Sequence, residues 1–217
     1  MQNEGRLVPY HSTDLTGRRV LVLAPHPDDE TFGCGGSMIL HRDAGDPVKV
    51  VFLTNGAMGD ISNQSDKETY VALRKKEAEK ACANLGVMDL EFWPYEDRSL
   101  ASSSGVLKQM IDLLEDFLPE LVYVPSLVEL HPDHRAAASL LLNAVRNLMI
   151  DFDLAFYEVG QPLSVNTLVD ITSVLDRKCK TFDEYKSQLL ERPYADICNA
   201  LNRFRSLTLP DKVTHAE

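Results

Sequence analysis

The 217-residue sequence predicts an α/β fold with three layers, in which helices cover both faces of a mostly parallel sheet. Short apolar runs of strand length alternate along the chain with longer segments that have the pattern of helices. The runs are apolar almost throughout, which is typical of parallel strands that are buried on both faces. No repeat or linker divides the chain, so we expect a single domain over 1–217 with its core at about 18–209.

Five strands are expected, each from one apolar run. The run at 18–24 stops at Pro25, and the prolines at 25 and 27 force an extended loop because they lack amide donors and restrict the backbone. The other strands are expected at 48–54, 90–93, 121–125 and 154–158.

Five helices are expected in addition. The first follows a glycine-rich turn at 33–36 and runs to about Ala44. The helix at 66–86 has the clearest limits, since Asp66 is a plausible acidic start and Gly86 a glycine stop. The others are expected at 106–117, 135–149 and 171–190. The segment up to about Gly17 and the tail after about Leu209 are expected to be loosely held.

Composition and charge argue against several classes of function. The chain has 22 Lys and Arg against 33 Asp and Glu, a formal net charge of −11. Nucleic acid is therefore not expected as a partner, because binding to its backbone needs a basic face, and an anionic membrane surface is disfavoured. No apolar run reaches the roughly 18 residues of a membrane span, and no signal-peptide pattern opens the chain.

The four cysteines form no CxxC pair, which is typical of reduced core residues in a cytoplasmic protein. Cys34 follows the first motif described below, but a thiolate would add a fourth protein ligand and close a catalytic site, so we interpret it as a core residue. We expect a cytoplasmic protein with a small-molecule partner. Assembly into a homo-oligomer is left open.

Two His-Pro-Asp motifs stand after predicted strands. The segment 26–29 (HPDD) follows the first strand, and 131–134 (HPDH) follows the fourth. Ligands of parallel sheets bind at the carboxyl ends of the strands, so the loops after residues 24, 54, 93 and 125 should line one crevice. A purely structural hydrogen-bond cluster is the alternative. Two such motifs at strand ends favour a metal site.

Zinc fits these residue types best. Catalytic zinc usually has three protein ligands and keeps a fourth position for water. His26, Asp29 and His134 would supply two neutral nitrogens and one negative oxygen. The site would then keep a net positive charge, which acidifies water and polarises a carbonyl. Iron(II) uses similar ligands, and the sequence leaves it open.

The other motif residues have natural catalytic roles. Asp28 could accept the proton of a water molecule at the metal, a contribution of about 10²–10⁴-fold. His131, as imidazolium, could stabilise an oxyanion or protonate the leaving amine. Asp133 could hold the His131 ring and favour its charged form. The alternative for Asp133 is a helix N-cap.

The string APHPDDETFGCGG, with HPDHRAA downstream, resembles the zinc-dependent deacetylases of the LmbE/PIG-L family. The resemblance covers most of the chain and implies a Rossmann-like fold. It also implies hydrolytic deacetylation of an N-acetylated amino sugar of the N-acetylglucosaminyl type. The zinc ligands that it implies are His26, Asp29 and His134, and the division between ligand and non-ligand histidines depends largely on it. Asp28 is then the general base, and His131 stabilises the oxyanion or protonates the amine.

Two further positions match sugar-binding residues of the family. Arg74 lies on the inward stripe of its helix, where Glu77 could pair with it structurally, and the resemblance implies contact with substrate. Asp97 matches an aspartate that hydrogen-bonds sugar hydroxyls, and a turn aspartate is its alternative. Glu129 stands where some members have a tyrosine, so help from a tyrosine at the oxyanion is not carried over.

Two rival functions stay open. One is a zinc amidase that cleaves a larger amide of a sugar conjugate, and the other is a sugar- or nucleotide-binding module without catalysis. The glycines at 33–36 do not form GxGxxG and are interpreted as close packing. Lys75 and Lys76 are interpreted as a solvated helix face. Family chains often continue beyond the position of Glu217, so a truncated C-terminus is one interpretation.

Overall fold

The computed structural model describes residues 8–60, 65–146 and 148–217. Five strands form one sheet in the order β3-β2-β1-β4-β5, and all four pairings are parallel. The strands are β1 (Val20–Ala24), β2 (Val48–Thr54), β3 (Asp89–Tyr95), β4 (Leu121–Pro125) and β5 (Asp153–Tyr157). The predicted fold class is confirmed, and each predicted strand is present within a few residues of its expected limits.

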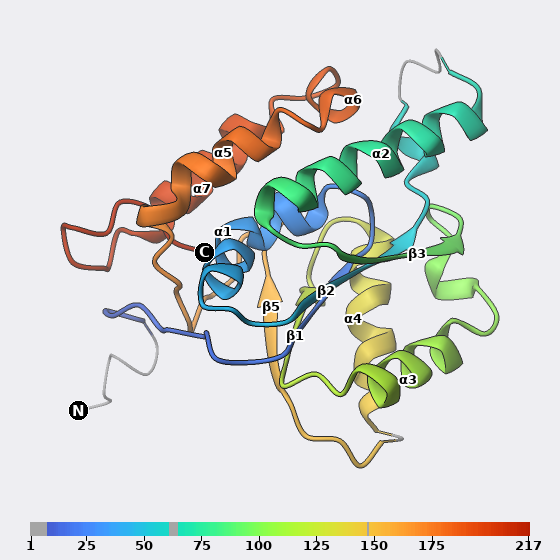
Figure 1. The fold of residues 1–217 in the computed structure, drawn as a ribbon, viewed down its shortest axis with the longest axis horizontal. Coiled ribbons are helices and arrows are strands. Elements are labelled where there is room, and N and C mark those ends of the chain that lie inside the picture. Colours follow the sequence, from blue (N-terminus) through green and yellow to red (C-terminus); the bar gives the residue numbers. More distant parts are fainter. Residues whose placement is uncertain (1–7, 61–64, 147) are drawn as a thin grey trace.

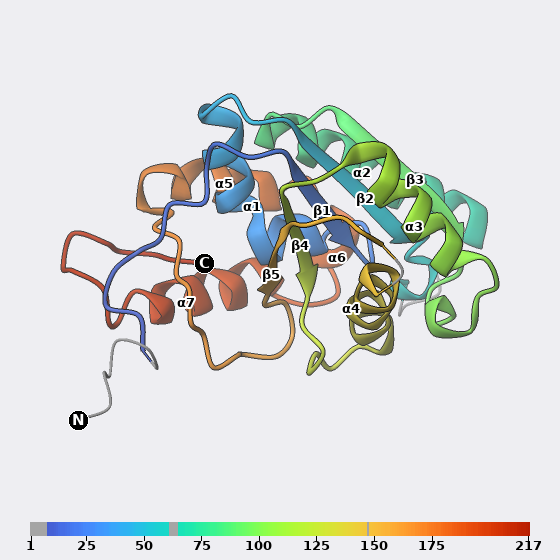
Figure 2. The ribbon, with the colours of Figure 1, turned by 90° about the horizontal axis from the view of Figure 1, so that it is seen from below.

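Helices cover both faces of the sheet and complete the three layers (Figures 1 and 2). The helices α1, α2 and α5 lie on one face, with α7 packed on α1 and α5, while α3 and α4 lie on the other face. The α-helices are α1 (Asp29–Asp43), α2 (Lys67–Leu85), α3 (Val106–Phe117), α4 (Pro132–Val145), α5 (Leu175–Phe182), α6 (Lys186–Leu189) and α7 (Tyr194–Arg205). Short 3-10 helices are η2 (Ala57–Gly59), η3 (Leu100–Ser102) and η4 (Thr172–Val174). Within the described residues, no helix combines the length and the apolar character that crossing a membrane requires.

The sheet separates two apolar cores, because successive residues of a strand face opposite sides. Val20, Val22 and Ala24 of β1 belong to the core that includes residues of α1, α2 and α5. Leu21 and Leu23 belong to the core that includes residues of α3 and α4. Burial on both faces explains why the strand runs are apolar at every position instead of alternating.

The strand order places both His-Pro-Asp motifs at one point of the sheet. From β1 the chain proceeds outward through β2 to β3, and it then returns to place β4 and β5 on the other side of β1. The connections after β1 and β4 therefore lead in opposite directions and leave a crevice between them, where ligands of such sheets bind. Each motif follows one of these two strands.

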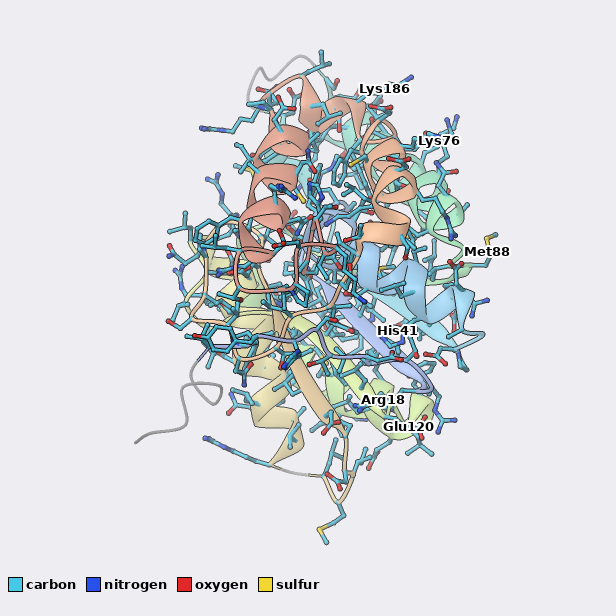
Figure 3. The ribbon with its side chains drawn as sticks, turned by 90° about the vertical axis from the view of Figure 1, so that its left-hand side faces the viewer. Arg18, His41, Lys76, Met88, Glu120 and Lys186 are labelled. Atoms are coloured by element: carbon cyan, nitrogen blue, oxygen red, sulfur yellow. The ribbon has the colours of Figure 1, made fainter. Side chains whose placement is uncertain are left out.

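The α2 helix confirms the predicted limits and their cause. The Asp66 side chain caps its first turn by accepting a hydrogen bond from the backbone N–H of Thr69, at 2.9 Å. Gly86 ends the helix with a positive φ of 85°. Lys75 and Lys76 lie on its exposed face, as expected, and Figure 3 shows Lys76 at the outer surface.

Other helices differ from the prediction. The α1 helix begins at Asp29, before the glycines, and is kinked at Cys34, where φ is −140° and ψ is 24°. The α4 helix begins at Pro132 because proline is favourable in a first turn. The helix expected at 171–190 is divided into η4, α5 and α6, since the chain turns at 183–185 to bury Tyr185 completely. The α7 helix was not predicted, and it leaves large apolar side chains such as Phe204 exposed.

The tail after residue 209 is packed, contrary to the prediction. Ala216 is fully buried. The side chain of Glu217 accepts hydrogen bonds from the backbone of Gly36 and from Lys178, which is itself fully buried. A buried ammonium group needs such a counter-charge, so the pair holds the tail against α1 and α5. Residues 8–17 are mostly exposed, but hydrogen bonds join the backbone N–H groups of Thr13 and Gly17 to Leu168 and Asp46. The loose hold expected for the segment up to about Gly17 stays a prediction, and residues 1–7 of it lie outside the described residues.

Gly33 allows α1 to lie directly against β5, so the close packing expected between the loop and its helix is found here between the helix and a strand. A Cβ atom at Gly33 would lie 2.2 Å from Cδ2 of Tyr157. The ring cannot move away easily, because its hydroxyl donates a hydrogen bond to the carbonyl of Leu23. We expect Gly33→Ala to lower the free energy of unfolding by about 1–3 kcal/mol, as measured by urea denaturation.

Gly35→Ala is the matched control, since a Cβ atom there has its nearest neighbour at 3.6 Å, an ordinary contact. Its expected effect is at most about 1 kcal/mol. Equal destabilisation by the two substitutions would contradict the role of Gly33.

Candidate metal centre

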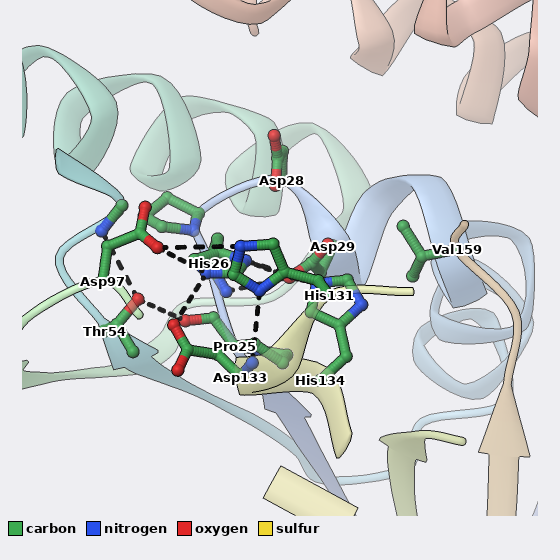
Figure 4. Close-up of polar contacts among 12 residues, drawn as sticks. Pro25, His26, Asp28, Asp29, Thr54, Asp97, His131, Asp133, His134 and Val159 are labelled. Carbon is green, nitrogen blue, oxygen red and sulfur yellow. Dashed lines mark hydrogen bonds and ion pairs between the residues drawn. The ribbon is translucent and has the colours of Figure 1, made fainter. Parts of the chain in front are cut away.

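Three atoms of the two motifs form a compact triangle at the crevice (Figure 4). Nδ1 of His26 and Nε2 of His134 each lie 3.1 Å from Oδ2 of Asp29, and the two nitrogens are 3.3 Å apart. Ligand atoms about 2.0–2.1 Å from a tetrahedral zinc ion are separated by roughly 3.3–3.4 Å. The donor set and its spacing therefore fit zinc, with one position left for water.

Two wider groups share His26. One joins His26, His131 and His134, and the other joins His26, Asp97, His131 and Asp133, with the ligand atoms of each group within 4.8 Å of one another. In the second group, Nε2 of His26 is already in contact with carboxylates. Its Nδ1 is the nitrogen that belongs to the triangle with Asp29 and His134.

Each histidine of the triangle has a second ring nitrogen that points away from the triangle, and a carboxylate lies near that nitrogen. Nε2 of His26 lies 3.3 Å from Asp133 and 3.4 Å from Asp97. Nδ1 of His134 lies 3.5 Å from Glu129, a charge contact without a hydrogen bond. Histidines that bind metals usually donate their second N–H to such a group, which fixes the tautomer and the ring orientation.

Asp28 lies beside the triangle in an unusual backbone conformation. Its φ of 146° is one that non-glycine residues rarely adopt, and such strain is found mainly at functional sites. Its carboxylate lies 3.1 Å from Nη2 of Arg74. Burial raises the pKa of Asp28 to about 7, against the opposing effect of Arg74. A carboxyl group with this pKa suits general base catalysis near neutral pH.

Arg74 is buried on α2 and joins the loops after β1 and β2. Its Nη1 donates to the carbonyl of Gly56 at 3.1 Å, and its Nη2 donates to the carbonyl of Pro27 at 2.6 Å. Glu77, the alternative partner, instead accepts hydrogen bonds at the start of α6. The charge partner of Arg74 is therefore Asp28, and contact of Arg74 with substrate stays a prediction.

His131 forms the N-cap of α4 and is partly exposed to the crevice. Its Nδ1 accepts a hydrogen bond from the backbone N–H of Asp133 at 3.2 Å, so in the neutral ring the proton is on Nε2. That nitrogen lies 3.8 Å from Oδ1 of Asp97. Burial lowers the pKa of His131, and the charges of His26 and His134 lower it further. The lowered pKa favours a neutral His131 that donates its Nε2–H, and the role of His131 as an imidazolium stays a prediction.

Asp133 differs from both of its sequence interpretations. Its carboxylate does not hold the His131 ring. It lies against His26 and accepts hydrogen bonds from the backbone N–H groups of Arg98 and Leu100. Nor is it the N-cap of α4, since His131 has that position. The cause is the helix start at Pro132, which directs the Asp133 side chain toward the loop after β3.

Asp97 is buried inside the site and does not lie at its rim. Its side chain is only 7% exposed, with Oδ1 near His26 and Oδ2 accepting a hydrogen bond from the backbone of Met58. Burial is the largest single effect and would raise the pKa of Asp97, but His26, the backbone N–H of Met58 and His131 together lower it. Its contact with sugar hydroxyls stays a prediction.

Glu129 is the site residue whose structural role the sequence analysis missed. It is 1% exposed and lies against His134, although the sequence suggested only the absence of a tyrosine at this position. The only sequence feature that could have indicated a buried Glu129 is its position between two apolar residues, Val128 and Leu130. That signal is weak, because local sequence does not show which of the three side chains is buried.

The carboxylates of this cluster raise the pKa values of two of its histidines. Burial alone would lower the pKa of His134, but Asp29 and Glu129 raise it to about 9. The pKa of His26 is raised in the same way, by Asp133 and Asp29 against burial. A cluster of carboxylates that draws protons onto its histidines is suited to a divalent cation.

We expect zinc affinity to rise with pH between about 7 and 9. Because His134 keeps its proton below a pKa of about 9, zinc must displace that proton to bind. If zinc displaces one proton, its apparent affinity should fall by about tenfold for each pH unit below the pKa, and each further displaced proton should add another factor of about ten. Competition titrations against a chelator at about pH 7 and pH 8, corrected for the chelator's own protonation, measure this effect.

The raised pKa of His134 also makes the stability of the metal-free protein depend on pH. A folded-state pKa raised above the ordinary 6.5 stabilises the metal-free fold at pH values below about 6.5, and this contribution is lost as the pH rises through about 9. Equal zinc affinity at the two pH values would contradict the proposed displacement of a proton.

The triangle opens into a cavity of about 1040 Å³. The loops after β1, β2, β3 and β4 all line it, which confirms the predicted crevice. They contribute polar groups such as His26, Asp97 and His131, and apolar groups such as Met58 and Leu130. This volume lies just above the usual range of about 300–1,000 Å³ for small-molecule sites, and the cavity extends from the triangle as far as Leu121 and Asp153.

The chain matches a family model described as "PIG-L: GlcNAc-PI de-N-acetylase" over residues 21–145. It is 30% identical over 202 residues to a probable N-acetyl-alpha-D-glucosaminyl L-malate deacetylase 2 of Bacillus cereus, with 84% of this chain and 90% of that protein covered. It is also 30% identical over 194 residues to a diacetylchitobiose deacetylase of Thermococcus kodakarensis, with coverage of 80% and 71%.

Among solved structures, the chain resembles the N,N′-diacetylchitobiose deacetylase of Pyrococcus horikoshii complexed with its inhibitor MPG. The TM-score is 0.80 at 26% sequence identity, and the match covers 93% of this chain and 82% of the other.

Proposed function

Since the chain belongs to the PIG-L family, whose enzymes are N-deacetylases, we propose that it is a zinc hydrolase that removes acetyl groups from N-acetylated amino sugars. The observation that carries the proposal is the triangle of His26, Asp29 and His134, with edges of 3.1–3.3 Å, beside the strained Asp28. Enzymes of this family are generally metal-dependent, and the donor set supports zinc with iron(II) as the alternative.

A zinc ion held by the triangle would supply Lewis acidity that acidifies water and polarises the acetamide carbonyl. Asp28 accepts the proton of the attacking water at its carboxylate, which Arg74 holds in place. His131 donates its Nε2–H to the oxyanion of the tetrahedral intermediate. When the C–N bond breaks, the proton returns from Asp28 to the leaving nitrogen. The products are acetate and a free amine.

Arg74 and Asp97 are the proposed contacts for the sugar, since both line the cavity beside the triangle. The proposed substrate is of the N-acetylglucosaminyl type, because the relatives are named for such compounds. We place the reaction in the cytoplasm, where the four free cysteines stay reduced.

The test combines metal analysis with a substrate panel. Purified protein is analysed by mass spectrometry for zinc and iron, and acetate release is measured from diacetylchitobiose and an N-acetylglucosaminyl malate. A sugar conjugate with a larger acyl group is tested beside them. Near-stoichiometric zinc with acetate release is the expected result. Cleavage of the larger amide alone would indicate an amidase. Absence of both metal and activity, even after zinc or iron is added, would leave a binding module.

A further inference from the structure

The loop between β4 and α4 buries its carboxylate and exposes its apolar side chains. Leu127, Val128 and Leu130 are 43%, 60% and 68% exposed, whereas Glu129 is 1% exposed. Exposed apolar side chains forfeit hydrophobic stabilisation, and a buried carboxylate loses its hydration. Because the exposed apolar side chains and the buried carboxylate are both unfavourable, the arrangement indicates a functional role for Glu129.

Glu129 contacts two parts of the site at once. Its Oε2 lies 3.5 Å from Nδ1 of His134. Its Oε1 accepts hydrogen bonds from the backbone N–H groups of Val159 at 2.8 Å and Gly160 at 3.1 Å. These two residues belong to the segment after β5 that lines the cavity. Glu129 thus joins a residue of the triangle to the cavity wall.

The position of Glu129 is set independently of His134. Nη1 of Arg135, on the first turns of α4, donates to the backbone carbonyls of Glu129 at 2.5 Å and Leu130 at 2.7 Å. A Cβ atom at Gly160 would lie 3.1 Å from Oε2 of Glu129, so the turn closes tightly on the carboxylate. Because the loop and the turn are both fixed, the carboxylate can orient the His134 ring.

We infer that Glu129 is the positioning residue of His134, an inference that rests on the proposed metal-dependent function. Nδ1 of His134 has no hydrogen-bond partner among the described residues, and the carboxylate of Glu129 lies 3.5 Å from it. Because a carboxylate only accepts hydrogen bonds, Glu129 would favour the His134 proton on Nδ1 and leave the Nε2 lone pair for the metal. Asp133 does the same for His26 with the nitrogens exchanged. Through its hydrogen bond with the backbone N–H of Val159, the same carboxylate fixes the position of the cavity wall relative to the metal centre. Glu129 itself is not a corner of the triangle.

The test is the zinc affinity of Glu129→Gln, measured by chelator competition. The amide has one acceptor oxygen and cannot serve both His134 and the turn, so affinity should fall about 10–100-fold. Glu158→Gln is the matched control. Glu158 is a neighbouring glutamate that holds the same segment through the backbone N–H of Leu163 and through Arg205, with no contact to the triangle. Its zinc affinity should equal that of wild type.

A measurement on the wild-type zinc protein does not depend on whether the variant folds. Nitrogen-15 NMR of the histidine rings should show a proton on Nδ1 of His134 and on Nε2 of His26. Wild-type zinc affinity in Glu129→Gln, or coordination of His134 through Nδ1, would overturn the inference while the proposed function stands. If the wild-type protein binds no metal, the proposed function fails and this inference falls with it.

Discussion

Asp28→Asn is expected to reduce acetate release by about 10²–10⁴-fold while the protein keeps its metal. The amide cannot accept the proton of the attacking water, but Asp28 is not part of the triangle that binds the ion. Because asparagine nearly matches aspartate in size, the contacts of Arg74 with the carbonyls of Pro27 and Gly56 should persist. Steady-state kinetics of acetate release and metal analysis of the same samples provide the measurement.

Asp46→Asn is the matched control for this substitution. Asp46 is also a buried carboxylate with a charge partner, in its case His41 at 2.7 Å, but it does not line the main cavity. Its variant should show altered stability with kcat near that of wild type. If Asp28→Asn retains wild-type kcat, or if Asp46→Asn loses as much, Asp28 is not the general base.

Asp29→Ala is expected to abolish both metal binding and activity. Oδ2 of Asp29 is the atom that both His26 and His134 approach at 3.1 Å, so its removal takes away one corner of the triangle. The loss of zinc affinity should exceed the roughly 100-fold that removal of a supporting partner can produce, since a ligand itself is lost. Chelator competition and acetate release measure the two effects.

The control lies on the same helix. Asp43, at the other end of α1, forms an exposed ion pair with Arg177, and Asp43→Ala should leave zinc affinity and activity unchanged. Stoichiometric, tightly bound zinc in Asp29→Ala would show that the ion is bound elsewhere, with the wider group of His26, His131 and His134 as the next candidate.

The two substitutions together separate binding from chemistry. Loss of rate with retained zinc is expected for Asp28, whereas loss of zinc and rate together is expected for Asp29. The two residues are adjacent, yet the start of α1 separates their roles. The backbone N–H of His26 donates to Asp29 and helps to orient it toward the triangle, while Arg74 binds Asp28. Neighbouring carboxylates with different environments are a common means of dividing two functions.

The C-terminal segments were the least predictable part of the fold. The periodic pattern at 171–190 continues through the turn at 183–185, and the pattern of α7 includes the exposed Ile197 and Phe204. The tail is held by a pair between Glu217 and Lys178, which are distant in sequence. Hydrophobic periodicity describes short windows of a chain, and it carries no information about ion pairs of this kind.

The sequence by itself determined the α/β class, the positions of the strands and the meeting of two His-Pro-Asp motifs at one edge of the sheet. Apolar strands buried on both faces require parallel pairing with helical layers, and parallel strands bring their carboxyl ends together. The tertiary structure alone decided which side chains face each other there. His26 and Asp133 are 107 positions apart, and the contact depends on where α4 starts and which way its first side chains point. The partners of Arg74 and Glu129 were hidden for the same reason, because the direction of a buried polar side chain depends on the packing of loops that are distant in sequence.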